Sequence, residues 1–410
     1  MIMATATADS SAPARPASRI LRRVALLTTA LLAAWLVLRA GADGWLSGEA
    51  PVTAARLAPG KARAAMAASR ALAGPTVDLG RPTVRQLVAR SLDRDVTNPM
   101  AIEFMALQAD QAGDHGRAAR LFHLSDTISR RSLPTRLWLI QASVDRGDVA
   151  GALQDFDRAL RTSTDAPKVL FPVLARASEE PALAPAIARL LDRPSDWRLV
   201  FLHDAVTDYG GASGVAAIAL RMQDRRWLVA NHVDETVVGQ LIAEDRFSAA
   251  RVVQDAFHPA GRSDDLVRDV HFADRRAHFP FGWQIEEQGE IGARRDRMNG
   301  RPILTYQSQS DGSGQIATQL LILPAGRYRL TTQTAIPAAD DTAPPFWTIT
   351  CAGQGGPQIA LLDQPRSGNA AIEFAMPQGC AAQWLGLNLR GSDRPDGQSG
   401  AVAAVWVNPR

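Results

Sequence analysis

Two stretches in the middle of the chain repeat the same residues at one spacing. Three pairs of identical residues are each separated by 34 positions: Gly113 and Gly147, Ala118 and Ala152, and Phe122 and Phe156. A unit of this length buries its apolar face only against its neighbours, so the pattern predicts stacked helix pairs. A non-repetitive helical bundle remains the alternative.

The spacing continues in weaker form along the chain. Pro99, Pro134 and Pro167 follow one another at similar intervals, and Ala186, Ala216 and Ala250 mark three eroded units. A helix expected over 83–93 would cap the array. The unit resembles the tetratricopeptide repeat, which has 34 residues and two antiparallel helices. The resemblance implies an α-solenoid over 60–258 that docks a partner protein.

An uncharged stretch near the N-terminus, 24–38, is flanked by arginines on both sides. Flanking arginines extend a short apolar helix to the thickness of a bilayer, because their charged groups reach the interfaces. The sequence therefore predicts a transmembrane helix over 20–40, preceded by a disordered cytoplasmic tail over 1–19 and followed by a linker over 41–59.

Orientation follows from the arginines that precede this stretch, because basic residues remain in the cytoplasm. The sequence therefore predicts a single-pass protein of a bacterial inner membrane, with residues 45–410 in the periplasm. The alternative is a signal peptide cleaved after Ala42, which would leave a soluble periplasmic protein.

From 259 to 410 the helical pattern gives way to short apolar or alternating runs between Gly, Pro, Asp and Ser clusters. Eight runs predict strands: 303–306, 316–323, 328–334, 346–351, 358–362, 370–374, 384–389 and 401–407. This number of short strands predicts an antiparallel β-sandwich, specifically a jelly roll. The predicted fold class is multidomain, with α followed by β.

Three phrases of this part resemble the jelly rolls of carbohydrate-binding modules. They are Phe281-Gly282-Trp283, the hairpin from Gln319 to Leu330, and the closing strand from Ala401 to Val407. The resemblance implies that aromatic rings stack on sugar rings, with Trp347, Trp283 and Tyr306 as the candidate glycan contacts. The remaining aromatic candidates are Trp384, Trp406 and Tyr328. Each of the six is alternatively a core residue of the sandwich.

The chain has two cysteines, Cys351 and Cys380, both within the predicted sandwich. Two cysteines in one small β domain predict a disulfide in an oxidising compartment. Buried free thiols are the alternative.

The sequence contains none of the short motifs that carry common chemistry. It has no phosphate-binding loop, no H-E-x-x-H and no C-x-x-C pair. We therefore predict a non-enzyme with no cofactor and no metal. Acidic residues alternate with the arginines along the chain, which argues against nucleic-acid binding.

An anchor, a repeat array and a sugar-module-like sandwich together resemble accessory proteins of bacterial surface-polysaccharide systems. The resemblance implies a non-catalytic, membrane-anchored scaffold that docks an envelope protein and contacts glycan, in polysaccharide synthesis or export. One alternative is an envelope assembly or chaperone-like factor that holds client peptides. A second is a glycan hydrolase that uses Glu286 and Glu287 as its carboxylate pair.

Overall fold

The computed structural model describes residues 82–259, 265–274, 278–287, 289–309, 311–338, 342–353, 355–391 and 397–410. The predicted tail, transmembrane helix and linker (1–19, 20–40 and 41–59) lie outside these residues. The chain divides into two compact units, 1–164 and 165–410, and each is described by itself. The sequence-based boundary at 258/259 stays a prediction, since the second unit contains both helices and strands.

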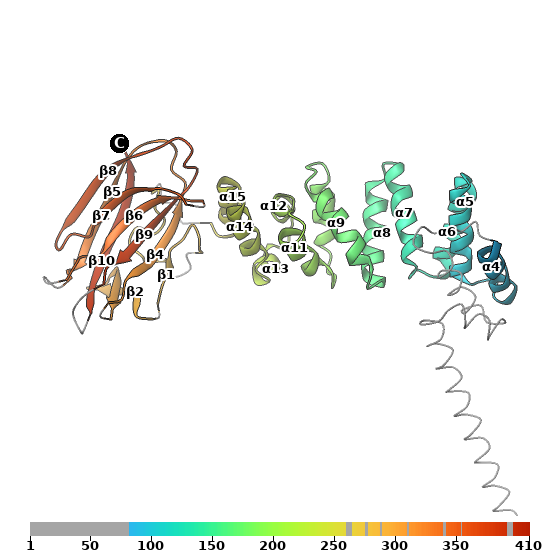
Figure 1. Ribbon diagram of the computed structural model, residues 1–410, viewed down its shortest axis with the longest axis horizontal. Coiled ribbons are helices and arrows are strands. Elements are labelled where there is room, and N and C mark those ends of the chain that lie inside the picture. The colour runs from blue at the N-terminus through green and yellow to red at the C-terminus, as the bar shows by residue number, and fades with distance from the viewer. Residues whose placement is uncertain are drawn as a thin grey trace, which may run out of the picture. The chain divides into compact units, whose positions relative to one another are not determined.

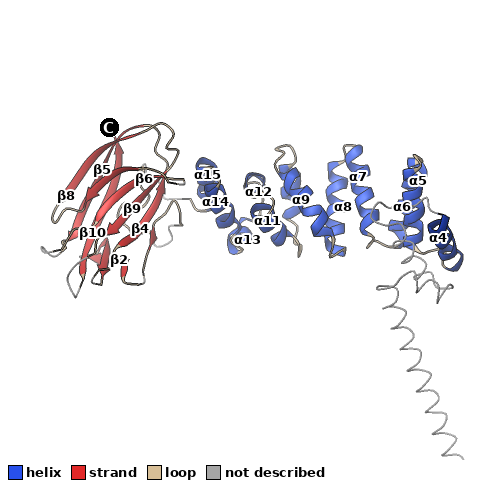
Figure 2. Cartoon of the chain, in the orientation of Figure 1, coloured by secondary structure: helices blue, strands red, loops and turns tan. Residues whose placement is uncertain are grey.

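Twelve helices occupy the described residues up to Phe257 (Figures 1 and 2). The first unit contains α4 (Pro82–Arg94), α5 (Pro99–Gln111), α6 (His115–Ile128), α7 (Leu133–Asp145) and α8 (Val149–Thr162). The second contains α9 (Ala166–Ser178), α10 (Ala184–Leu191), α11 (Arg198–Thr207), α12 (Ala212–Ala219), α13 (Arg225–Ala230), α14 (Val233–Ala243) and α15 (Phe247–Phe257). α5 packs on α6, α7 on α8, and α14 on α15. The helix expected over 83–93 is confirmed as α4.

The same turn joins α5 to α6 and α7 to α8. Gly113 and Gly147 have φ of +79° and +70°, which a residue with a Cβ adopts only at an energetic cost. The aspartate after each glycine, Asp114 or Asp148, caps the next helix by accepting a backbone N–H three residues on, at 2.9 Å. The repeated alanine and phenylalanine of both units are buried. The 34-residue spacing thus reflects one helix hairpin built twice, while membership of the tetratricopeptide family stays a prediction.

The localisation prediction is corrected by the helix lengths. The longest of the described helices, α6 and α8, have 14 residues, or about 21 Å against roughly 30 Å of hydrocarbon. Among the described residues no helix is both long and apolar enough to cross a membrane. The single-pass inner-membrane assignment, with 45–410 in the periplasm, is therefore withdrawn.

The C-terminal part of the second unit is a sandwich of two five-stranded antiparallel sheets. Its strands are β1 (Gln284–Ile285), β2 (Ile291–Met298), β3 (Arg301–Ser308), β4 (Gly314–Leu321), β5 (Gly326–Ile336), β6 (Phe346–Cys351), β7 (Gln358–Asp363), β8 (Asn369–Met376), β9 (Gln383–Leu389) and β10 (Gln398–Pro409). One sheet has the order β1-β4-β9-β6-β7 and the other β2-β3-β10-β5-β8. All eight predicted strands are confirmed, and so is the jelly roll, because from β3 onward the chain passes repeatedly between the two sheets.

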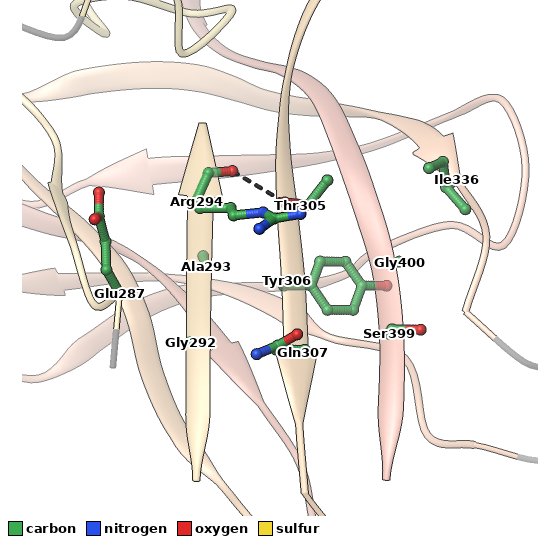
Figure 3. Close-up of a pocket in the computed structure, with 10 residues that line it drawn as sticks. All are labelled: Glu287, Gly292, Ala293, Arg294, Thr305, Tyr306, Gln307, Ile336, Ser399 and Gly400. Atoms are coloured by element: carbon green, nitrogen blue, oxygen red, sulfur yellow. Dashed lines mark hydrogen bonds between the residues drawn. The ribbon is translucent and has the colours of Figure 1, made fainter. Parts of the chain in front are cut away.

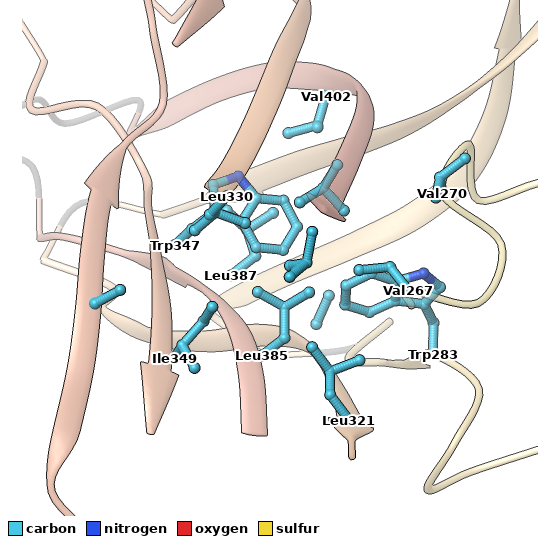
Figure 4. Close-up of a cluster of buried hydrophobic side chains, with 14 of the residues drawn as sticks. Val267, Val270, Trp283, Leu321, Leu330, Trp347, Ile349, Leu385, Leu387 and Val402 are labelled. Atoms are coloured by element: carbon cyan, nitrogen blue, oxygen red, sulfur yellow. The ribbon is translucent and has the colours of Figure 1, made fainter. Parts of the chain in front are cut away.

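The sandwich core lies between the two inner faces (Figure 4). Trp347 is fully buried there, and its indole N–H donates to Thr332 Oγ1 at 3.0 Å and to Gln364 Oε1 at 2.9 Å. A buried indole N–H without an acceptor would be costly, so these polar partners fix the ring in one position. The predicted disulfide joins Cys351, at the end of β6, to Cys380, before β9.

Candidate functional site

The candidate site lies on the outer face of the sheet β2-β3-β10-β5-β8. In β3, Leu304 and Tyr306 belong to the buried core cluster, whereas Thr305 and Gln307 alternate with them. Because successive side chains of a strand point to opposite faces, Thr305 and Gln307 lie on the outer face. The β2 and β10 residues that pair with them extend the same surface.

A pocket of about 330 Å³ opens on this face (Figure 3). One row across the sheet consists of Gly292, Gln307 and Ser399, which are paired in register. The next row pairs Arg294 with Thr305, whose hydroxyl donates to the Arg294 carbonyl at 3.2 Å. The site is therefore assembled by strand register from segments about a hundred residues apart along the chain.

The groups around the pocket offer both donors and acceptors of hydrogen bonds. Gln307 and Ser399 are exposed and can each donate and accept, while exposed Glu287 at the rim accepts. The Arg294 side chain is 75% exposed and lies 3.7 Å from the Asp296 carboxylate. Such a mixture suits a ligand rich in hydroxyl groups, which also donate and accept.

Tyr306 lies under this surface. It is 4% exposed and belongs to the core cluster, although it also borders the pocket. Its partner on β10 is Gly400, and a Cβ there would lie 2.3 Å from the Tyr306 hydroxyl oxygen. Burial raises the pKa of Tyr306 to about 12, against a smaller opposite effect of Arg366. Tyr306 is thus a neutral phenol beneath the site.

The three predicted glycan contacts are all core side chains. Trp347 is 0%, Trp283 3% and Tyr306 4% exposed. Their ring faces pack against protein, so the prediction that they stack on sugar is wrong for all three. In a two-sheet sandwich the largest apolar rings fill the space between the sheets. Of the three, only Tyr306 borders the pocket, and it lies beneath the surface that would face a ligand.

An aromatic pair that the sequence analysis missed lies elsewhere on the sandwich. Phe279 is 47% exposed and stacks on half-buried Trp384, with ring centroids 5.9 Å apart and an angle of 13°. Its position beside Pro280, outside every predicted strand, gave no signal of this pairing. Trp406 is also half-buried, and Tyr328 is buried.

Carboxylates and metal ligands are sparse around the site. Glu287 is the only acidic side chain among the described residues that line the pocket. Its neighbour Glu286 is exposed but does not line the pocket. Across the described part of the chain, no group of three or more His, Cys, Asp or Glu could hold a metal ion.

No protein-family model and no curated protein sequence matches this chain. Several solved structures resemble part of it. TmCBM61, solved in complex with β-1,4-galactotriose, is 13% identical, with 36% of this chain and 100% of that chain covered and a TM-score of 0.26. The xylan-binding domain CBM22-1 of Xyn10C from Paenibacillus barcinonensis is 10% identical, with 37% and 97% covered and a TM-score of 0.25.

A third similar structure is the enzymatically active domain of tailspike protein 4 from bacteriophage CBA120. It is 16% identical, with 36% of this chain and 21% of that chain covered and a TM-score of 0.26. Likenesses this weak give no argument about ligand or catalysis.

Proposed function

We propose that this chain is a non-catalytic binding protein that holds a glycan on the outer face of β2, β3 and β10. The observation that carries the proposal is the open pocket itself, with exposed Arg294, Gln307 and Ser399 in two adjacent rows of the sheet. Amide, hydroxyl and guanidinium groups on adjacent strands can pair with neighbouring sugar hydroxyls, and the strand backbones that carry these groups are already ordered.

In this proposal the helical segment docks a partner protein. Val169 and Val173 on α9 are 46% and 53% exposed, and Val200 on α11 is 51% exposed. Apolar side chains on helix surfaces supply contact area that excludes water when a partner binds. A scaffold role in surface-polysaccharide synthesis or export completes the proposal. It rests on the repeat array and the sandwich, the two parts of the three-part resemblance that remain once the anchor is withdrawn.

The hydrolase alternative needs two carboxylates that face one bond of the glycan, about 5 to 10 Å apart. Glu286 and Glu287 directly follow β1, and only Glu287 lines the pocket. This arrangement favours binding over cleavage. The peptide-holding alternative has no observation of its own that sets it apart from partner docking.

The test measures binding of the full chain to an array of neutral and acidic oligosaccharides, followed by titration calorimetry on the best ligand. Gln307→Ala removes an exposed amide from the pocket, and we expect affinity to fall roughly tenfold, as for the loss of one or two hydrogen bonds. Gln358→Ala, at an exposed position of β7 in the other sheet, is the matched control and should bind like the wild type.

Two results would contradict the proposal. One is the absence of binding to every glycan on the array. The other is an equal effect of the Gln307 and Gln358 substitutions, which would place the ligand elsewhere on the molecule.

A further inference from the structure

The sheet β2-β3-β10-β5-β8 splits at one point along β10. β3 pairs with β10 from Ser308↔Gln398 to Leu304↔Val402, but β3 continues to Arg301 without β10 as a partner. On its other side, β10 shifts register against β5 on both sides of Val402. Such irregularities bend a strand and end its pairing, and they are common beside binding sites.

A segment that precedes the sandwich strands takes the place of β3 beside β10 beyond the split. Val405 N–H donates to the Val270 carbonyl at 3.0 Å, and His271 Nδ1 lies 3.4 Å from the Ala403 carbonyl. Because a carbonyl only accepts, Nδ1 carries the hydrogen of this contact and Nε2 is directed away from it. His271 therefore stands at one wall of the gap.

The gap is a cleft of about 890 Å³, which lies within the usual range for ligand sites. It is lined by His271 and Ala273 and by residues of the β2–β3 hairpin between Met298 and Ile303. Half-buried Pro302 and Ala335 give the cleft apolar surface, and buried Ile303 packs beneath it. A ligand with an apolar face would cover this surface.

The charge of the cleft is one-sided. Arg301 and His271 line it, and no described lining residue is acidic. Arg301 is exposed and forms no ion pair with any residue in the described part of the chain. A guanidinium with its donors free matches the two oxygens of a carboxylate in a bidentate pair.

The cleft continues the pocket of the proposed function. Thr305 and Gln307 line the pocket, and Pro302 and Ile303 line the cleft, all on β3. Gln307 and Ile303 are four residues apart, roughly 13 Å along the strand. On β5, Ile336 belongs to the pocket and Ala335 to the cleft. One extended oligosaccharide can therefore contact both.

We infer that the glycan is acidic and that the cleft binds its carboxylate-bearing sugar through Arg301. The inference rests on the proposed function, because a neutral part of the same oligosaccharide occupies the pocket at Gln307. Half-buried Pro302 covers one face of the acidic sugar, and Arg301 holds its carboxylate.

The test compares the full chain binding to oligogalacturonate and to the same oligosaccharide after methyl esterification, which removes the charge but keeps the backbone. We expect the acid to bind about tenfold more tightly than the ester. Arg301→Gln should reduce this preference to less than about twofold without weakening the ester, whereas Arg301→Lys should keep part of it. Arg329→Gln, at an exposed position of β5 that lines neither site, should bind like the wild type.

The outcomes separate this inference from the proposed function. Equal binding of acid and ester by the wild type, or a preference that survives Arg301→Gln, overturns the acidic specificity and leaves glycan binding intact. If neither oligosaccharide binds but galacturonate alone does, and Arg301→Gln abolishes that binding, the cleft is supported and the longer site is not. Absence of binding to all three probes overturns the acidic specificity, and the proposed function then depends on the array of neutral and acidic oligosaccharides alone.

Discussion

The pair Tyr306 and Gly400 shows how single residues shape the site from below. The phenol is polar at one end and apolar along its ring, and it lies across β10 only because its partner strand has no side chain at that point. Any larger residue at position 400 would displace the ring from the core cluster. Since Thr305 and Gln307 flank Tyr306 on the same strand, movement of the ring would also move the pocket.

The alkaline titration of Tyr306 is a first prediction. Burial raises its pKa to about 12, against about 10 in the unfolded chain. Between these values Tyr306 releases its proton first in the unfolded state, so its contribution to the free energy of unfolding should fall as pH rises from about 10 to 12, by at most roughly 2–3 kcal/mol. Tyr306→Phe should remove this dependence together with one late step in the ultraviolet titration of tyrosinate.

The control is Tyr209→Phe, because Tyr209 is 39% exposed. The chain has only three tyrosines, so the loss of one ionisation step is readily counted. If the late step remained in the Tyr306 variant and disappeared in the Tyr209 variant, the assignment would be wrong.

At the scale of elements, the sequence predicted those helices and strands that a local pattern of residues determines. Eight strands were predicted from short apolar or alternating runs between turn residues. The helix hairpins were predicted from the residues repeated at one spacing, among them Gly113 and Gly147. β2 was missed: its sequence IGARRDRM carries three arginines and an aspartate, and it lies at the edge of its sheet. Charged residues are typical of edge strands and hide the alternating pattern. Arg294 of the site lies on this strand.

The site as a whole could not be predicted for a related reason. Gly292, Gln307 and Ser399 meet only through the register of three strands, which no local pattern in the sequence specifies. The aromatic residues that the sequence singled out were large and apolar, and these properties equally favour the core. Trp347 and Trp283 both lie in the core.

The cap of α8 gives a prediction for a helix. The Asp148 carboxylate accepts the Gly151 N–H at 2.9 Å, and Gly151 leaves room for it, since a Cβ there would lie 2.2 Å from a carboxylate oxygen. Asp148→Ala should lower the free energy of unfolding by about 1 kcal/mol in urea titrations, and Asp148→Asn by much less. Gln154→Ala, at an exposed position of the same helix, should change it by less than about 0.5 kcal/mol. Equal effects of the Ala and Asn substitutions would show that the side-chain cap is unimportant.

At the scale of the molecule, Arg268 links the last helix to the sandwich within the second unit. Its guanidinium pairs with Asp255 of α15, which also pairs with Arg251 at 2.8 Å. Its backbone N–H and carbonyl are both held by the buried Gln319 side chain of β4, at 2.9 and 3.0 Å. Burial lowers the pKa of Arg268 to about 10, with a further contribution from Arg251. One residue is thus fixed to a strand by its backbone and to a helix by its side chain.

This double attachment predicts that α14 and α15 derive part of their stability from the sandwich. Arg268→Ala keeps the backbone contacts with Gln319 but removes the pair with Asp255, at a cost of roughly 1–3 kcal/mol. Amide hydrogens of α14 and α15 should then exchange faster in hydrogen-exchange mass spectrometry, while those of β4 and β9 keep their protection, because local opening reports local contacts. Arg329→Ala, at an exposed position of β5, should leave both regions unchanged. Equal loss of protection in α15 and β4 would instead mean that helices and sandwich open together, and that Arg268 stabilises the unit as a whole.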